Sequence, residues 1–285
     1  MPAPPKGPAK PIQAFTLKKQ LHTPSDHLGD YTLLFVGEKK TGKTSLAIQF
    51  PDHFVLQFEP GNTDHLEGCY FQDIHNWEEA KAAVTFLQKN PDFCQTLVID
   101  DIPSVYEYCL REVRRYLKLA ENEKPGWTGY DVCKRWFDEW VRQVEGLPSG
   151  KIYTAHTKLT DATTRTGRTI SQLEPSWTGQ CKTVLDKYVK LTGYIVMNDD
   201  GSRELQIIGD DFIKANNGFD THFLLNGKQM KSIPLGKSAQ EGYQNLIRAW
   251  NNNHQPKKQQ QPQQTKTTPN NGGQQKKKTV SLDDL

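Results

Sequence analysis

Residues 37–44 read Gly-Glu-Lys-Lys-Thr-Gly-Lys-Thr, and they fit the phosphate-loop pattern G-x-x-x-x-G-K-[ST] at every defined position. An apolar run at 31–36 precedes them and an amphipathic run at 43–50 follows, so we expect a strand, a loop and a helix in that order. The glycines let the backbone approach a phosphate, and the amides at the start of the helix favour an anion. The predicted nucleotide-binding residues are Gly37, Glu38, Lys39, Lys40, Thr41, Gly42, Lys43, Thr44 and Ser45.

Two side chains of this loop should carry chemistry. We expect Lys43 to reach the β and γ phosphates of ATP, and the Thr44 hydroxyl to hold the accompanying Mg²⁺. A further metal contact should come from the end of a neighbouring buried strand, and the β-favouring run 96–99 is followed by Asp100 and Asp101. We expect Asp100 to contact Mg²⁺ through water and Asp101 to orient it or face solvent. The alternative is that such an aspartate only caps the next helix.

Short β-rich runs alternate with amphipathic stretches through the middle of the chain, which predicts an α/β fold with a mostly parallel sheet flanked by helices. The expected strands lie at 31–36, 53–58, 95–100, 151–155, 189–197 and 204–209. The expected helices lie at 43–50, 77–89, 103–119, 130–145, 179–186 and 238–250. In the helix at 130–145, Trp136 and Trp140 fall on an apolar stripe, so both are expected in the core.

Composition predicts one domain between two arms. The 285-residue chain is 35% apolar, which is low for a single globule, and its net charge is +3. The segments 1–29 and 251–285 carry +3 and +4, so the middle carries −4. We therefore expect an ATPase domain at 30–250, a flexible Pro/Lys-rich N-terminal arm, and a disordered Gln/Lys-rich tail. The tail ends in an acidic and apolar tip at 280–285, which either docks a single-stranded DNA-binding protein or another replication or recombination protein, or only solubilises the chain.

The same composition excludes several classes of protein. The apolar runs are much shorter than the roughly 20 residues of a membrane span, and the N-terminus lacks the apolar stretch of a signal peptide. We therefore expect a cytoplasmic protein without a membrane partner. The five cysteines are odd in number and widely spaced, which argues against a disulfide framework and against a structural zinc site.

Two predicted loops combine cations with aromatic side chains. The first is the Thr-rich segment 157–178 and the second is 121–130. Such loops suit a single-stranded DNA backbone with a stacking platform; alternatively, both are surface loops whose tryptophans dock on the body. The candidate DNA-binding residues are Lys158, Arg165, Arg168 and Trp177 in the first loop and Lys124 and Trp127 in the second.

These features together resemble a known family. The phosphate loop, Glu59 after the second strand, Asp100-Asp101, the Ala-His-Thr at 155–157 and the run DKYVKLTGYIV are similar to RecA-type ATPases encoded by bacteriophages. The chain looks most like the phage single-strand annealing and recombination ATPases that consist of a RecA-like core alone. The resemblance implies a RecA-like P-loop core, ATP hydrolysis, single-stranded DNA binding and self-assembly into a ring or filament, in the bacterial host cytoplasm if the protein is phage-encoded.

The resemblance also implies residue roles. Glu59 would orient the attacking water, a role that Asp101 takes in another class of P-loop enzymes. His156 would sense the γ-phosphate and signal to 157–178, although a lone histidine there is equally often only hydrogen-bonded in place. Lys214 begins a partial match to a segment that reaches the neighbouring subunit's nucleotide, but the arginine of that segment is absent, so slow basal hydrolysis is expected.

The sequence thus predicts a DNA-stimulated ATPase in which Lys43, Glu59, Asp100, His156 and Lys214 are catalytic, Thr44 and Asp100 hold Mg²⁺, and ATP turnover promotes annealing or strand exchange. One alternative is a ring helicase or loader of the same fold. Another is a DNA- or protein-binding module that uses ATP as a switch without significant turnover.

Overall fold

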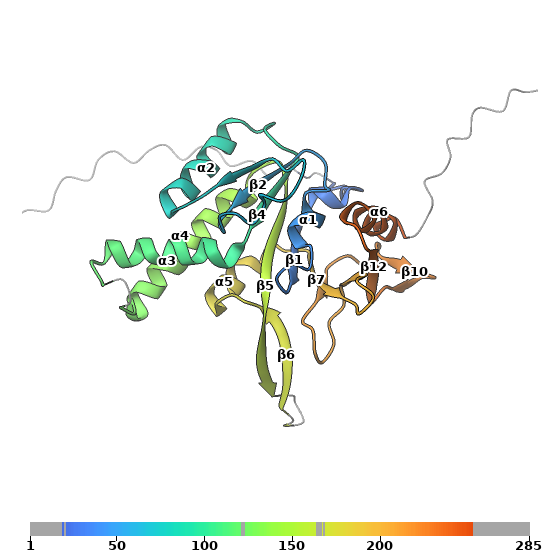
Figure 1. Cartoon of the computed structure of the whole chain (residues 1–285). Coiled ribbons are helices and arrows are strands. Elements are labelled where there is room, and N and C mark those ends of the chain that lie inside the picture. Colours follow the sequence, from blue (N-terminus) through green and yellow to red (C-terminus); the bar gives the residue numbers. More distant parts are fainter. Residues whose placement is uncertain (1–18, 20, 121–122, 164–166, 168, 253–285) are drawn as a thin grey trace, which may run out of the picture. The chain divides into compact units, whose positions relative to one another are not determined.

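A computed structural model describes residues 19, 21–120, 123–163, 167 and 169–252. A central sheet runs through these residues (Figure 1). Its strands are β1 (Thr32–Gly37), β2 (His53–Gln57), β3 (Phe71–Asp73), β4 (Thr96–Asp100), β5 (Gly150–Thr163), β6 (Thr169–Pro175), β7 (Leu191–Met197), β8 (Arg203–Gln206), β9 (Asn216–Asn217) and β12 (Ser232–Gly236). A separate two-stranded sheet pairs β10 (Leu224–Leu225) with β11 (Lys228–Gln229).

The strand order is β12-β8-β7-β1-β5-β4-β2-β3, with β6 paired to β5 and β9 paired to β7. The strands from β3 through β7 along this path are parallel, and β8, β6 and β9 pair antiparallel with their neighbours. The prediction of a mostly parallel sheet is therefore confirmed. Because the carboxyl ends of parallel strands meet at one edge, the residues that follow β1, β2 and β4 lie together there.

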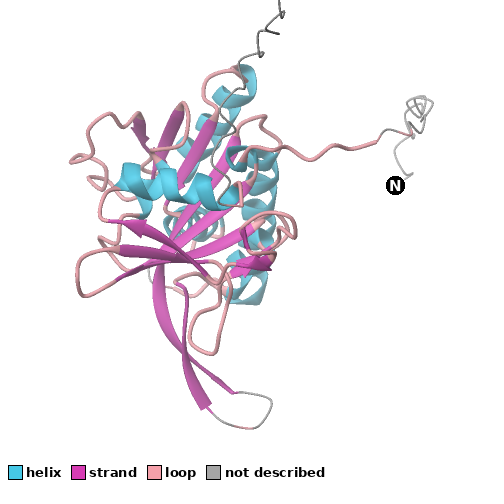
Figure 2. Cartoon of the chain, turned by 90° about the vertical axis from the view of Figure 1, so that its right-hand side faces the viewer, coloured by secondary structure: helices cyan, strands magenta, loops and turns pink. Residues whose placement is uncertain are grey.

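Helices cover both faces of the sheet (Figure 1), and Figure 2 shows the same layers after a quarter turn. They are α1 (Lys43–Ala47), α2 (Trp77–Lys89), α3 (Ile102–Tyr116), α4 (Gly126–Glu145), α5 (Gly179–Leu185) and α6 (Ala239–Trp250), with a short 3-10 turn at Leu28–Asp30. Each predicted helix is present, and α2 has the predicted bounds. Its start is fixed by Asn76, whose side chain accepts a hydrogen bond from the Glu79 amide at 2.9 Å.

The alternation of side chains along β1 shows how the two layers are built. Leu34 and Val36 belong to the cluster under α2, α3, α4 and α5, whereas Leu33 and Phe35 belong to the cluster under α1 and α6. All four side chains are fully buried. A strand that is covered on both faces reads as a continuous apolar run, which is why the sequence signal for β1 is strong.

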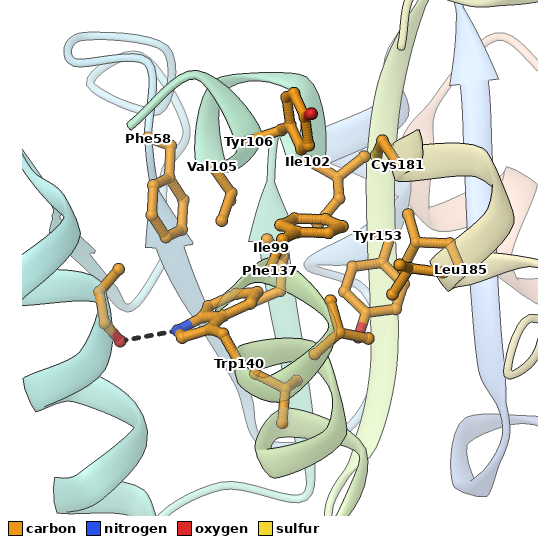
Figure 3. Packing of buried hydrophobic residues seen from close by; sticks show 14 of the residues in the cluster. Phe58, Ile99, Ile102, Val105, Tyr106, Phe137, Trp140, Tyr153, Cys181 and Leu185 are labelled. Carbon is orange, nitrogen blue, oxygen red and sulfur yellow. Dashed lines mark hydrogen bonds between the residues drawn. The ribbon is translucent and has the colours of Figure 1, made fainter. Parts of the chain in front are cut away.

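The larger core is centred on α4 (Figure 3). Trp140 is only 2% exposed and donates a hydrogen bond from its indole nitrogen to the Ala80 carbonyl at 3.0 Å. Phe137 and Phe58 pack edge-on against neighbouring aromatic rings in the same cluster. The prediction of a core position is confirmed for Trp140, and Trp136 lies partly buried at the edge of this cluster.

We expect Trp140→Ala to destabilise the protein by about 3–5 kcal/mol, because it leaves a large cavity and an unpaired buried carbonyl. Urea unfolding would measure the loss. Trp127→Ala is the control, since Trp127 is 90% exposed and its removal should change the unfolding free energy by less than about 0.5 kcal/mol. Equal effects of the two substitutions would contradict this description of the core.

The predicted loop at 157–178 is mainly a β-hairpin, and that prediction was wrong. β5 continues past the expected end at 155 as far as Thr163, and it pairs with β6 in register from Thr157 opposite Pro175 to Thr163 opposite Thr169. The hairpin projects away from the helical layers (Figures 1 and 2). The sequence did not predict this hairpin because its described side chains are a mixture of exposed and partly buried ones, without the apolar alternation that marks a half-buried strand.

No helix in the described part of the chain is long and apolar enough to cross a membrane. The helices and strands extend from Leu28 to Trp250, within the predicted domain apart from the first two residues of the 3-10 turn. The predicted flexible arm, 1–29, is described at 19 and 21–29, and its last residues pack on the domain: Leu28 is 1% exposed, and the Asp26 carbonyl accepts a hydrogen bond from the Trp250 indole nitrogen at 2.7 Å. The rest of the arm, and the predicted disordered tail 251–285 apart from 251 and 252, lie outside the described residues, and the domain division stays a prediction.

Candidate functional site

The phosphate loop connects β1 to α1 as predicted. Lys40 and Gly42 both have positive φ, at 66° and 92°, and at the second of these positions glycine avoids the steric cost of a side chain. A Cβ on Gly37 would lie 2.9 Å from the Ile195 carbonyl oxygen, so the loop also needs a glycine where it leaves β1. Glu38, Lys39 and Lys40 are exposed at the loop's outer turn.

Lys43 is buried beneath this loop. Its ammonium donates hydrogen bonds to the carbonyls of Gly37 at 3.1 Å and Glu38 at 2.9 Å, and it lies 3.2 Å from Nδ1 of His156. Burial lowers the pKa of Lys43, and the charges of three nearby carboxylates oppose that shift. The amine is thus held in place by backbone carbonyls that also shape the loop.

Thr44 and Asp100 place oxygen atoms side by side that can serve as metal ligands. The Thr44 hydroxyl donates to Oδ2 of Asp100 at 2.9 Å, and the Thr154 hydroxyl on β5 donates to Oδ1 of the same carboxylate. Asn62 also donates to Oδ2, at 2.8 Å. Hydroxyl and carboxylate oxygens are the ligands that Mg²⁺ prefers, so Thr44 and Asp100 fit the metal. Bound there, Mg²⁺ would neutralise phosphate charge.

Glu59, His156 and Asp101 form a second polar group beside Lys43, and their ligand atoms lie within 4.8 Å of one another. Because an ammonium can only donate, Nδ1 of His156 accepts from Lys43, which places the imidazole proton on Nε2. That nitrogen faces Oε2 of Glu59 at 3.4 Å. The hydrogen bond with His156 is the main cause that lowers the pKa of Glu59, so this carboxylate is ionised at neutral pH.

Asp101 differs from Glu59 in burial and in its partners. It is 2% exposed, and its Oδ1 accepts the Ser104 amide at 3.1 Å, which makes it the N-cap of α3. Burial raises the pKa of Asp101 to about 6. The alternative role predicted for an aspartate at this strand end, capping the next helix, therefore applies to Asp101. Asp100 instead accepts the Thr44 hydroxyl.

A cavity of about 580 Å³ lies over the phosphate loop, Lys43, Glu59 and His156. Its lining includes four residues that were not predicted from the sequence: Asn62, His65, Leu66 and Arg203. Asn62 follows Glu59 by three residues in an irregular loop, and Arg203 starts a strand far along the chain. Neither position has a motif, so no sequence signal could have found them.

The predicted DNA-binding residues that the structure describes lie on different elements of the fold. Trp177 is 8% exposed and belongs to the same buried cluster as Trp140, so it offers no free face for stacking and that prediction is wrong. Lys158 is exposed on the hairpin and donates to the Trp177 carbonyl at 2.9 Å. Lys124 and Trp127 are exposed at the start of α4. Arg165 and Arg168 lie outside the described residues.

Lys214 is not among the residues that line the cavity over the phosphate loop, and it forms an ion pair with Glu174 on β6. Its side chain is 44% exposed. The pairing ties the base of the hairpin to the segment before β9, and the role of Lys214 toward a neighbouring subunit stays a prediction.

A comparison with protein families matches residues 30–219 to the AAA domain. No curated protein sequence matches the chain. The matched segment begins just before β1 and includes the phosphate loop, Asp100 and the hairpin strand that carries His156. Since the match covers two thirds of the 285 residues and its fold and phosphate loop are present, the chain belongs to the AAA-domain family of P-loop ATPases.

Proposed function

We propose that this protein is an Mg²⁺-dependent ATPase that binds single-stranded DNA and promotes annealing or strand exchange, as the phage RecA-like recombination ATPases do. The observation that supports the proposal best is the path of β5. This strand starts in the central sheet, carries His156 within reach of Lys43 and Glu59, and continues without a break into the projecting hairpin. A change at the γ-phosphate can therefore act directly on the hairpin.

The geometry favours Glu59 over Asp101 as the residue that orients the attacking water. Glu59 lines the cavity, is ionised at neutral pH and has a side chain that is 36% exposed, so water reaches it. Asp101 is engaged as a helix cap and nearly inaccessible. Lys43 would bind the β and γ phosphates, and His156 would hold Glu59 and respond to the γ-phosphate.

The hairpin is the proposed contact with DNA. Its described part presents Lys158 and the 61%-exposed Leu159, which suits contact with backbone phosphates and unstacked bases. Trp127 remains the one exposed aromatic among the predicted DNA-binding residues, and it lies on a different element. The proposal includes self-assembly into a ring or filament, in which Lys214 reaches the neighbouring subunit. This part rests only on the resemblance to phage RecA-type ATPases.

The hairpin is tested by shortening it. Residues 161–171 would be replaced by Asn-Gly, which closes a two-residue turn between Thr160 and Gln172, a pair already opposite each other. We expect binding of a fluorescein-labelled oligo(dT), followed by anisotropy in the presence of Mg²⁺ and a non-hydrolysable ATP analogue, to weaken at least about tenfold. ATP hydrolysis without DNA should persist, because the site residues are unchanged.

His156→Ala supplies the test of coupling. In the wild type, the ATP analogue should tighten oligo(dT) binding relative to ADP, and His156→Ala should abolish that difference. Wild-type DNA affinity in the shortened variant would refute the part of the hairpin beyond Thr160 as a DNA-binding element. An unchanged nucleotide effect in His156→Ala would refute the coupling through His156. If the wild-type protein hydrolyses ATP but does not bind the oligonucleotide, the proposed DNA-binding function is refuted and the ATPase activity serves another function.

A further inference from the structure

Trp127 is 90% exposed, which sets it apart from the other five tryptophans of the chain. Four of these are at most 8% exposed, and Trp136 is partly buried. Tryptophan is enriched at protein–protein interfaces, where its ring fills a pocket of the partner. We propose that Trp127 docks into a groove between α2 and α4 of a second copy of this chain, in a head-to-tail contact that does not involve the nucleotide.

The start of α4 holds Trp127 on a fixed support. Pro125 is the N-cap of α4 and packs against Gly129, because a Cβ on Gly129 would lie 2.4 Å from the Pro125 Cβ. Arg114, near the end of α3, donates from Nε to the Glu123 carbonyl at 3.2 Å. The junction of α3 and α4 lies at the outer end of the helical layer, at the left of Figure 1. The ring is thus presented by ordered backbone, so docking it costs little backbone entropy.

The groove that would receive the ring has a volume of about 490 Å³. Trp136 contributes a partly buried ring to its lining, beside the nearly buried rings of Trp77 and Trp140. The centroids of Trp77 and Trp140 are 6.0 Å apart, so the aromatic side chains form one continuous floor. Aromatic rings attract one another in tilted and edge-to-face arrangements, and a floor of this kind therefore suits an incoming indole.

A chain does not make this contact with its own groove. Trp127 and Trp136 are nine residues apart on α4, which is two and a half turns at 3.6 residues per turn. Their side chains therefore leave opposite faces of the helix. The ring of one copy can meet the groove of the next copy head to tail, and contacts of this kind join copies into rows or rings.

The charge near Trp127 is positive. We call residues 114–135 the α3–α4 tip; it has six Lys or Arg and three Asp or Glu, a net charge of +3, in a domain whose net charge is −4. Lys124 lies three residues before Trp127 and is exposed. Lys134 lies seven residues after it, about two turns further along the same face of α4. The exposed ring is thus flanked by cations.

The groove carries the opposite charge. Glu78 on α2, Glu112 on α3 and Glu139 on α4 line it, against one lysine, Lys81. Lys81 pairs with Glu78 at 2.8 Å, and Glu139 is exposed at the rim. A groove with this excess of carboxylates attracts the cationic tip of another copy and repels the phosphates of DNA. Charge and ring shape therefore favour the same occupant.

The test measures self-association of the full-length chain without nucleotide, by sedimentation equilibrium. A contact centred on one ring is small and weak, so the copies are separate at the micromolar concentrations used for unfolding, and the range should extend from about 10 to about 300 µM. We expect the average mass of the wild type to rise above that of the monomer with concentration, and to fall again when NaCl screens the charges.

Two variants remove one side of the contact each. Trp127→Ala should weaken the association at least about thirtyfold, and Glu139→Lys at least about fivefold. The matched controls are Tyr70→Ala, which removes a 69%-exposed ring elsewhere, and Asp92→Lys, which reverses an exposed charge in the loop after α2. Both controls should associate as the wild type does. Circular dichroism would verify that all four variants are folded.

Mixing the two variants tests the head-to-tail geometry. Trp127→Ala keeps an intact groove and Glu139→Lys keeps an intact tip, so only one productive contact is left between them. Equal amounts of the two should form a one-to-one dimer that does not grow further, at concentrations where each variant alone is monomeric. Glu139→Lys should also hydrolyse ATP at the wild-type rate, because Glu139 does not line the nucleotide cavity.

A wild type that stays monomeric over the whole range, a Trp127→Ala protein that associates like the wild type, or a mixture that stays monomeric would each overturn this contact. If Trp127→Ala weakens binding of oligo(dT) but not self-association, the α3–α4 tip is a nucleic-acid surface and the inference is wrong. None of these results bears on the proposed ATPase, which is judged by hydrolysis and DNA binding. The two can therefore fail separately.

Discussion

Lys43→Ala is expected to reduce ATP hydrolysis by about 10²- to 10³-fold, because it removes the cation that meets the charge developing on the β and γ phosphates. The lysine is buried and held beneath the phosphate loop by the Gly37 and Glu38 carbonyls. Phosphate release under saturating MgATP would measure the effect.

The matched control for Lys43→Ala is Lys89→Ala, which removes an exposed lysine at the end of α2. It should hydrolyse ATP at the wild-type rate. Circular dichroism of both variants would verify that the fold is retained. Wild-type turnover in a folded Lys43→Ala protein would refute the phosphate loop as the ATP site.

Glu59→Gln is expected to lower kcat by about 10²- to 10⁴-fold while ATP still binds, because the substitution keeps the shape of the side chain and removes the charge that polarises water. Its low pKa, caused first by the hydrogen bond with His156, means that the wild-type carboxylate is charged at neutral pH. Single-turnover hydrolysis together with an independent measurement of ATP affinity would separate turnover from binding.

Two further variants decide whether the role belongs to Glu59. Asp64→Asn makes the same chemical change on an exposed carboxylate of the same loop and should leave kcat unaltered. Asp101→Asn tests the rival residue. If Glu59→Gln hydrolyses ATP at a near-normal rate and Asp101→Asn does not hydrolyse it, the water-orienting role belongs to Asp101.

The phosphate loop and the buried strands could be predicted because their signals are local. The run 31–36 is apolar on both faces, and the loop requires glycine at 37 and 42 for the close approach and positive φ seen in the structure. Asp100 was predictable for the same reason, since a β-favouring run ended at it. The core position of Trp140 followed from its place in a helical stripe.

The rest depended on tertiary contacts that no local pattern records. The loop after His156 is a hairpin because β6 returns along β5 over seven paired positions. Trp177 looked available for stacking, but its side chain is buried in the same cluster as Trp140 and Cys181. Asn62 and Arg203 reach the cavity from an irregular loop and a late strand, so their place in the site became visible only once the sheet order was known.

Steady-state ATP hydrolysis by the wild-type protein, measured with and without a single-stranded oligonucleotide, tests the central claim most directly. We expect slow Mg²⁺-dependent hydrolysis alone and a clear increase with single-stranded DNA, larger than that caused by duplex DNA of the same length. Absence of Mg²⁺-dependent hydrolysis under both conditions would contradict the assignment as a working ATPase, and hydrolysis that does not respond to single-stranded DNA would contradict the coupling through His156 and the β5–β6 hairpin.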